Sequence, residues 1–103
     1  LEALTVAIPG DTRNIPEGIE LGEYLAIQYW FIGMMAVVEN VHYQYQTGFM
    51  TEEGWLRSRN GLKRQMEINA LVLPQLQAAK RNMSQPFLEE VERMEAEVRA
   101  AQE

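Results

Sequence analysis

Cysteine is absent from the 103-residue sequence, and histidine occurs only once, at His42. Without cysteine the chain has no disulfide framework, no thiolate metal site and no cysteine nucleophile. The single histidine leaves one candidate general base, and neither Ser58 nor Ser84 lies in the Gly-x-Ser-x-Gly pattern of a nucleophile elbow. We therefore expect no enzymatic activity and no cofactor.

Basic residues are also few, because nine Lys and Arg stand against fifteen Asp and Glu. The resulting net charge of −6 leaves no broad basic surface that could displace counterions from a nucleic acid. A hydrophobic content of 47% and the short length predict one globular helical domain over residues 1–103. The first residue is Leu1 rather than methionine, which indicates a fragment of a longer chain that lacks an N-terminal segment.

Alternation with period two is never sustained, whereas apolar residues recur at helical spacing, so the sequence predicts an all-α fold. Prolines and glycines within residues 8–18 predict a loop, and Pro74 predicts a break in the helix that precedes it. The fold should be a small helical bundle with helices at residues 17–47, 52–70, 74–82 and 85–101.

The link between the first two predicted helices is short and carries signals for both helix ends. Gly48 suits a left-handed C-terminal cap, and Thr51 suits an N-cap because Glu52 and Glu53 follow it in the first turn. Two helices joined so closely pack antiparallel. The sequence therefore predicts an antiparallel helical hairpin that turns at Gly48–Thr51, with a positive φ at Gly48.

The first predicted helix is poor in polar residues, because Gln28 is the one strongly polar residue among the fifteen at positions 24–38. A membrane-spanning helix needs about twenty apolar residues and usually has basic flanks. This run is shorter and is flanked by glutamates, among them Glu23 and Glu39. It therefore predicts a long central apolar helix around which the bundle packs.

Small and bulky residues lie on opposite faces of this helix at about 100° per residue. The small face carries Gly22, Ala26, Gly33 and Ala36, and the bulky face carries Leu21, Tyr24, Phe31, Ile32, Met35 and Val38. A domain of this size is too small to cover both faces. We therefore expect the missing N-terminal segment or a second copy of the chain to cover one of them, and a second copy would make the protein a homo-oligomer.

Glu39 and His42 have the Glu-x-x-His spacing that carboxylate-bridged metal sites use. Di-iron bundles need two such motifs and two further carboxylates, so a site here would need a symmetric dimer with Glu23 or Glu67 as the additional ligand. The alternative is a structural role, in which His42 packs as a polar-tipped ring and Glu39 hydrogen-bonds a neighbouring group. We favour the structural role because the ligand set is incomplete, and we expect His42 to bind no metal.

The structural role predicts specific contacts around the hairpin. Glu39 and Asn40 are expected to form hydrogen bonds across it, and Tyr45 is expected to pack against Trp55. A buried carboxylate needs a partner. For Glu39 this partner should be a tyrosine hydroxyl, a backbone amide at the start of the next helix, or an arginine among residues 57–64.

Three further groups of residues have two interpretations each. The four basic residues at positions 57–64 predict a solvated helix face that pairs with glutamates, and the alternative is contact with anionic lipid or an acidic partner. The methionines at helical spacing predict core packing rather than an adaptable binding surface, namely Met34, Met35 and Met66. The aromatic residues likewise predict core rather than the walls of a pocket, namely Tyr24, Tyr29, Trp30, Tyr43, Tyr45 and Trp55.

The segment ENVHYQYQTGFMTEEGW, residues 39–55, resembles the signature E-N-x-x-Y-Q-Y-x-x-G-x-x-x-E-E-x-W of an uncharacterised bacterial family of small proteins. The matching residues are Glu39, Asn40, Tyr43, Gln44, Tyr45, Gly48, Glu52, Glu53 and Trp55. With the flanking segments IPEGIELGEY and NMSQPFLEEV, the resemblance covers residues 8–94. The chain departs from the family at His42, where an aromatic residue is usual, and near Gln75 and Leu76, where paired tryptophans are expected.

Members of that family place a membrane helix ahead of a helical soluble domain. The resemblance implies a bacterial protein in the cytoplasm or at the cytoplasmic face of the inner membrane, tethered by the missing N-terminal segment, and it implies no assigned activity. The expected function is a non-enzymatic helical interaction module that self-associates. The alternative is a metal- or small-ligand-binding bundle with an inter-chain site around Glu39 and His42.

Overall fold

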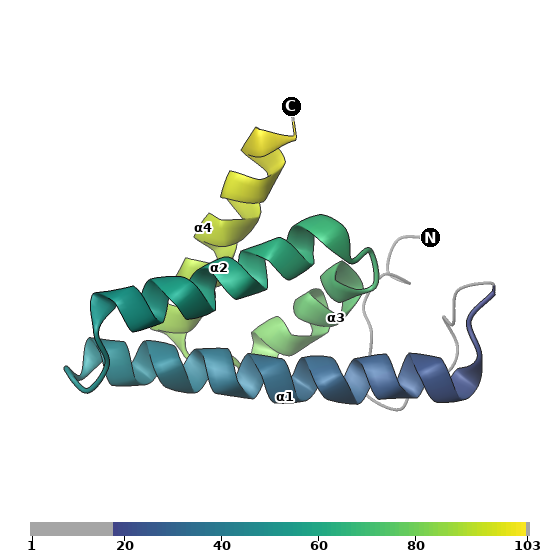
Figure 1. Cartoon of the computed structure of the whole chain (residues 1–103), viewed down its shortest axis with the longest axis horizontal. Helices are drawn as coiled ribbons and strands as arrows, with labels where there is room; N and C mark the ends of the chain where they lie inside the picture. The colour runs from purple at the N-terminus through teal and green to yellow at the C-terminus, as the bar shows by residue number, and fades with distance from the viewer. Residues whose placement is uncertain (1–17, 103) are drawn as a thin grey trace.

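The structure, a computed structural model, describes residues 18–102, and the predicted loop at residues 8–18 lies outside them except for Gly18. Four α-helices follow one another, with a short 3₁₀ turn, η2, before the last (Figure 1). No strand occurs within residues 18–102, which confirms the all-α prediction. The elements are α1 Leu21–Gln46, α2 Glu52–Ile68, α3 Val72–Ala79, η2 Lys80–Asn82 and α4 Gln85–Ala101.

Helix α1 begins at Leu21, later than the predicted start at residue 17. Gly18 has a φ of +83°, and Glu20 is extended with ψ 151°, so the helical conformation cannot extend further back. The backbone amide of Glu20 donates to Glu23 Oε1 at 3.3 Å in a capping box. The charged cap therefore fixes the start of a helix whose following turns are almost entirely apolar.

The turn between α1 and α2 has the predicted geometry. Gly48 has a φ of +86°, the left-handed conformation that favours glycine. The amide of Phe49 donates to the carbonyl of Gln44 at 2.7 Å, and that of Gly48 donates to the carbonyl of Tyr45 at 3.2 Å, which is a Schellman motif. Thr51 Oγ1 then accepts from the amide of Gly54 at 3.0 Å and caps α2. The prediction of a tight helical hairpin at Gly48–Thr51 is confirmed.

Helix α3 corrects the prediction that a helix begins at Pro74. The helix begins at Val72, so the proline lies in its first turn. First-turn amides have no partner inside a helix, so the missing N–H of proline costs no hydrogen bond there. The break that Pro74 predicted within NALVLP, residues 69–74, is confirmed and lies at Asn69, whose Oδ1 accepts from the amide of Leu71 at 3.0 Å.

The core lies between one face of α1 and the other three helices, which all pack on the same side of it (Figure 1). Met35 and Met66 are buried and Met34 packs against the core, as predicted. α1 buries one face only, made by Tyr24, Gln28, Phe31, Met35, Val38 and His42. The other helices contribute Trp55, Leu62, Val72, Leu76, Phe87, Val91, Met94 and Val98, among others. The long apolar helix is thus the platform of the bundle, with its opposite face uncovered.

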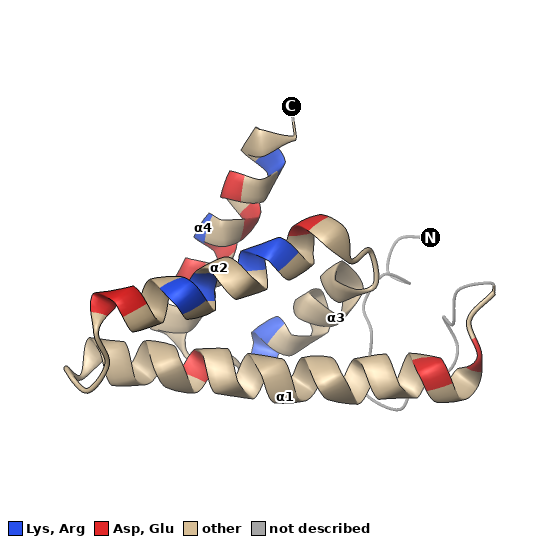
Figure 2. Cartoon of the chain, viewed as in Figure 1, with Lys and Arg blue, Asp and Glu red and all other residues tan. Residues whose placement is uncertain are grey.

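Charges are distributed very unevenly between the helices. Figure 2 shows basic and acidic residues along α2 and α4, whereas α1 carries acidic residues at only a few positions. Arg59 of α2 pairs with both Glu90 and Glu97 of α4, and Lys63 pairs with Glu97 at 2.9 Å. The exposed Arg57 pairs with Glu53 within α2. These pairs confirm that the basic stretch at residues 57–64 is a helix face that pairs with glutamates.

Candidate functional site

Two signature residues, Tyr45 and Trp55, meet His42 and Phe87 where the end of α1, the start of α2 and α4 come together. The ring of His42 lies 4.7 Å from the ring of Trp55 and 5.6 Å from that of Phe87, measured between centroids. The ring of Tyr45 stacks on the ring of Trp55, with centroids 6.2 Å apart and an interplanar angle of 16°. The predicted contact between Tyr45 and Trp55 is therefore confirmed. His42 serves as one wall of an aromatic cluster that ties the hairpin to α4.

Burial lowers the pKa of His42 below its ordinary value of 6.5, because the charged imidazolium is poorly solvated among aromatic rings. The negative charges of Glu90 and Glu39 oppose this effect, and the positive charge of Arg93 adds to it. The ring is therefore neutral at physiological pH. A neutral ring between Trp55 and Phe87 behaves as an aromatic packing residue with a polar edge.

Glu39 binds a different partner from the one predicted across the hairpin. Its Oε2 accepts from the backbone amide of Ser84 at 2.9 Å, and Ser84 is the N-cap residue of α4 rather than of α2. The first amides of a helix lack intrahelical partners and carry partial positive charge, so a carboxylate is stabilised there. The expected class of partner, a backbone amide at a helix start, is correct. The helix is wrong, because α4 rather than α2 faces this side of α1.

Asn40 does not form the predicted hydrogen bond across the hairpin within residues 18–102. Its side chain is exposed, since it lies one helical position beyond Glu39 and turns away from the core. Of the other signature residues, Tyr43 is also exposed and Glu52 and Glu53 lie exposed in the first turn of α2. The signature is thus divided between residues that build the junction and residues that project outward.

The metal-site alternative requires Glu39 and His42 to converge with further ligands. His42 faces Trp55 and Phe87, whereas Glu39 faces Ser84. Over residues 18–102, nowhere do three or more His, Cys, Asp or Glu side chains gather into a group suited to a metal ion. Glu23 participates in the capping box at the far end of α1, and Glu67 lies exposed on α2. Within one chain, these four residues do not come together.

The ion pairs between α2 and α4 perturb two carboxylates. Hydrogen bonds from Arg59 and Lys63 lower the pKa of Glu97 from 4.5 to about 2. Burial of Glu90 favours its neutral form, but hydrogen bonds from Arg93 and Arg59 outweigh this effect, so its pKa also lies below the ordinary value. Both groups are satisfied within this network. They stabilise the packing of α4 against α2, and neither carboxylate lines the cavity between α1 and α3 that is described below.

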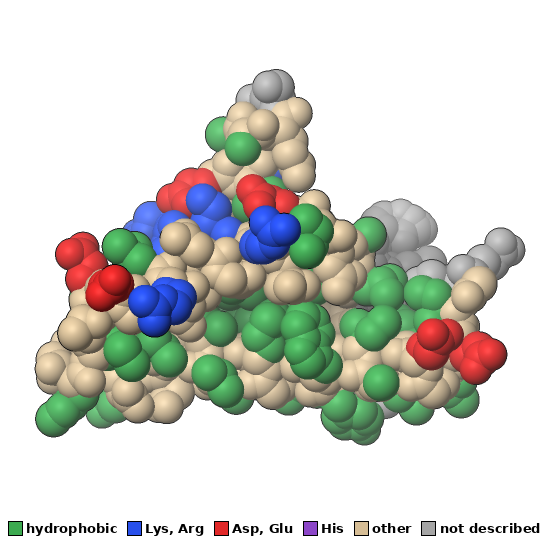
Figure 3. Space-filling model, in the orientation of Figure 1, with side chains coloured by type: hydrophobic (Ala, Val, Ile, Leu, Met, Phe, Trp, Pro, Cys, Tyr) green, Lys and Arg blue, Asp and Glu red, His purple; other side chains and the backbone are tan. Residues whose placement is uncertain are grey.

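The uncovered face of α1 exposes several large hydrophobic side chains. Figure 3 shows hydrophobic side chains gathered along α1. Tyr29 and Val37 are exposed to 60% and 61%, and Trp30 and Ile32 are also exposed. No charged residue occurs between Glu23 and Glu39. An apolar surface this long on a small domain is typical of an interaction site.

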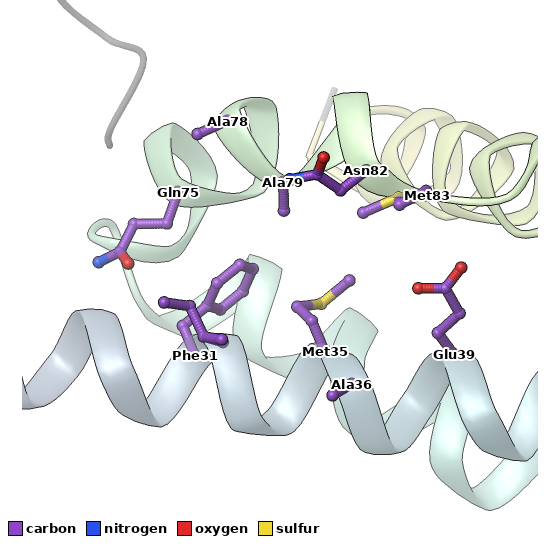
Figure 4. A pocket seen from close by; sticks show the side chains of 10 residues that line it. Phe31, Met35, Ala36, Glu39, Gln75, Ala78, Ala79, Asn82 and Met83 are labelled. Carbon is purple, nitrogen blue, oxygen red and sulfur yellow. The ribbon is translucent and has the colours of Figure 1, made fainter. Parts of the chain in front are cut away.

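A second feature is a cavity of about 270 Å³ between α1 and the segment from α3 to Met83 (Figure 4). Its α1 wall comes from Phe31, Ile32, Met35, Ala36 and Glu39, and its opposite wall comes from Gln75, Ala78, Ala79, Asn82 and Met83. The prediction that the aromatic residues form core is correct for Tyr24 and Trp55 but wrong for Tyr29, Trp30 and Tyr43, which are exposed, and none of these five lines the cavity. Phe31 is the single aromatic side chain in its wall.

The sequence offered little indication of this cavity. Ala78 and Ala79 look like ordinary helix-forming residues, and Gln75 lies where the resembled family has tryptophan. The short side chains opposite Met35 leave the space open, which depends on how α3 approaches α1 and cannot be read from either segment alone.

We compared the chain with protein-family models, with curated proteins and with solved structures, and no match was found in any of the three comparisons.

Proposed function

We propose that this protein is a non-enzymatic helical interaction module that self-associates through the uncovered face of α1. The observation that supports it most is that α1 is apolar on both faces although the chain covers one. The uncovered face centres on Gly33 and carries Gly22, Ala26, Tyr29, Trp30, Ile32 and Val37. A second copy of the same face would bury this surface without requiring any complementary partner.

Small residues along the centre of this face allow two helices to approach closely. A Cβ added at Gly33 meets no atom of another part of residues 18–102 within 4 Å, so no contact among these residues accounts for glycine at this position. Glycine in the middle of a helix costs about 1 kcal/mol relative to alanine. Close approach of another backbone, flanked by Tyr29 and Trp30, would compensate for this cost.

Charge favours an antiparallel pair of α1 helices. The first turn region carries Glu20 and Glu23, and α1 has no basic residue in its last turn. Parallel pairing would place these carboxylates beside their copies, where like charges repel. Antiparallel pairing separates them by most of the helix length, which is about 39 Å for 26 residues at 1.5 Å per residue. The proposed dimer is therefore isologous, with two-fold symmetry across the outer face.

Two matched substitutions test the proposal by light scattering on a sizing column. Val37→Glu places a charge on the outer face, whereas Ile68→Glu places the same charge on α2, at a site with nearly equal exposure (61% and 62%). We expect the parent and Ile68→Glu to elute as dimers and Val37→Glu as a monomer. A monomeric parent, or a dimeric Val37→Glu variant, would contradict the proposal.

Membrane association is a second candidate, because α1 is also long and apolar enough to cross a membrane by length and composition. The acidic residues at its start and the net charge of −6 disfavour an anionic membrane surface. A parent chain that is monomeric in solution but floats with vesicles of zwitterionic lipid would support this candidate instead. From the resemblance of residues 39–55 to a membrane-tethered bacterial family, we propose that either function belongs in the bacterial cytoplasm or at the cytoplasmic face of the inner membrane.

The metal-binding alternative has a separate test. If a dimer brought Glu39 and His42 of two copies together, purified protein would contain stoichiometric iron, manganese or zinc, and His42→Ala would remove it. We expect elemental analysis to give the same trace level of metal for the parent and for His42→Ala. Stoichiometric metal in the parent that is lost in the variant would establish the alternative.

A further inference from the structure

The cavity between α1 and α3 has apolar walls and a polar group at each end. Figure 4 shows Gln75 at the end beside Phe31 and Glu39 at the other end, where the carboxylate rises toward Met83. Its volume of about 270 Å³ is just below the range of about 300–1,000 Å³ typical of small-molecule sites. The cavity therefore has room for one small molecule with an apolar body and two polar ends.

Gln75 is the first indication that this cavity has an occupant. Its side chain is 94% buried, with 6% exposed, and its Nε2 has no hydrogen-bond partner within residues 18–102. A buried amide donor left unpaired costs about 1–3 kcal/mol, and an apolar residue of similar size would avoid that cost. Gln75 lines the cavity, and Figure 4 shows its amide at the end beside Phe31. An acceptor on a bound molecule would satisfy it there.

Glu39 is the second indication. Its Oε2 accepts one hydrogen bond, from Ser84, whereas a carboxylate offers about four acceptor positions. Glu39 forms no ion pair with any side chain of residues 18–102, and no Lys, Arg or His lines the cavity. An apolar cavity that ends in a carboxylate without an ion-pair partner favours a cation.

The spacing of the two ends limits the size of the occupant. Glu39 lies eight residues beyond Phe31 on α1, which corresponds to about 12 Å along the helix axis. Gln75 lies beside Phe31 at one end of the cavity, and hydrogen bonds at both ends of an occupant take up part of this span. An aromatic ring with a two-carbon amine arm and a hydroxyl on the far side of the ring has a suitable length and shape.

We propose that the cavity binds a small amphiphilic amine. Its ammonium group donates to Glu39, its apolar body lies along Phe31 and Met35, and a hydroxyl or carbonyl oxygen at its other end accepts from the amide of Gln75. This site differs from the outer face of α1, although Ile32 and Ala36 lie close to both. It also differs from a metal site, because His42 faces away into the aromatic cluster.

Four related probes test the chemistry by NMR titration of the parent chain. Tyramine carries both polar ends, phenethylamine lacks the hydroxyl, 4-ethylphenol lacks the amine, and 3-(4-hydroxyphenyl)propionate replaces the amine with a carboxylate. We expect saturable shifts of the backbone amide signals of Ala78 and Ala79 with tyramine, weaker binding of the two truncated probes, and the weakest binding of the carboxylate.

Two variants connect the binding to the named residues. Glu39→Gln keeps an acceptor for Ser84 but removes the charge, and we expect it to weaken tyramine binding about tenfold, the loss expected for one charge-assisted hydrogen bond. Glu67→Gln makes the same change at an exposed site and should bind like the parent. Gln75→Leu should bind tyramine and phenethylamine equally, because the group that distinguishes them is gone.

Three results would overturn the inference: no saturable shifts with tyramine, equal binding of the carboxylate probe, or unchanged tyramine binding by both Glu39→Gln and Gln75→Leu. Repeating the titration with Val37→Glu separates this inference from self-association, since that variant changes the outer face but no residue of the cavity. Tyramine binding by a monomeric variant would support the site whatever the oligomeric state of the parent.

Discussion

Helices α1 and α4 solve the same packing problem in different ways. Helix α4 buries a single stripe formed by Phe87, Val91, Met94 and Val98, and beyond the half-buried Leu88 its remaining positions carry mostly glutamate, arginine and alanine. Helix α1 also buries one stripe, but its exposed positions carry tyrosine, tryptophan, isoleucine and valine. A helix with a solvated outer face has the composition of α4. The composition of α1 therefore indicates a further contact.

The charged side chains of the two helices also differ. Through Glu90 and Glu97, α4 is fixed to α2 by ion pairs, whereas Glu39 is the single charged residue of α1 between Glu23 and the end of the helix. Ion pairs near the surface orient helices but contribute little stability each. The stability of the isolated chain should therefore depend on the buried stripes, and the outer face of α1 should contribute nothing until it is covered.

The largest predicted effect compares a buried aromatic residue of α4 with an exposed one of α1. Phe87 is fully buried and Tyr29 is 60% exposed. In the Val37→Glu background, which we expect to be monomeric, Phe87→Ala should lower the free energy of unfolding by about 3–5 kcal/mol. Tyr29→Ala should change it by less than about 0.5 kcal/mol. Urea denaturation measures both, and a large loss with Tyr29→Ala would show that the outer face is covered within one chain.

An intermediate effect is expected at the ion pairs of α4. Arg59→Ala removes one of the two arginine partners of Glu90, which is mostly buried, and should cost about 1–3 kcal/mol. Arg57→Ala breaks an exposed pair with Glu53 and should cost less than about 0.5 kcal/mol. Equal losses in the two variants would mean that burial does not decide the value of these pairs.

The same network predicts acid sensitivity. The folded-state pKa of Glu97, about 2, lies below its ordinary value of 4.5, so its stabilising contribution is present above pH 4.5 and is lost as the pH falls toward 2. Arg59→Ala should therefore make the free energy of unfolding less dependent on pH across this window. Denaturant titrations of the parent and the variant at several acid pH values measure the difference. If the free energies of unfolding of the parent and Arg59→Ala changed equally with pH, the assignment of a lowered pKa to Glu97 would be wrong.

The smallest predicted effect concerns His42. Burial lowers its pKa below 6.5 in the folded state, so protonation favours the unfolded chain and stability falls as the pH drops below 6.5. His42→Phe keeps an aromatic ring beside Trp55 and should remove this part of the pH dependence. Thermal melts at about pH 7.5 and about pH 5.5 bracket the transition. A parent that is equally stable at both values would show that the ring is not buried as described.

Local sequence signals predicted the hairpin accurately because its determinants are local. Gly48 and Thr51 act through their own backbone and the next few residues. The contact between Tyr45 and Trp55 follows directly from that turn. Pro74 shows the limit of such signals, since the same residue is compatible with a helix break or with a first turn, and capping by Asn69 decides between them.

The partner of Glu39 and the cavity could not be predicted in the same way. Both depend on how α3 and α4 fold back onto α1 after a turn at Asn69, which involves residues far apart in the sequence. The presence of an uncovered apolar face on α1 was predicted correctly, because so short a chain cannot cover both apolar faces of this helix. That a second copy of the chain covers this face is the central proposal.

Sedimentation equilibrium of two glycine variants tests most directly the proposal that the chain self-associates through the outer face of α1. Gly33 on the outer face of α1 and Gly61 on α2 both lie within helices, and neither has an atom of the chain within 4 Å of an added Cβ. Glutamine at either position should raise helix stability by several tenths of a kcal/mol. We predict that Gly61→Gln remains a dimer and Gly33→Gln becomes a monomer, because its side chain blocks the approach of a second α1. A dimeric Gly33→Gln variant with parental affinity would contradict the account.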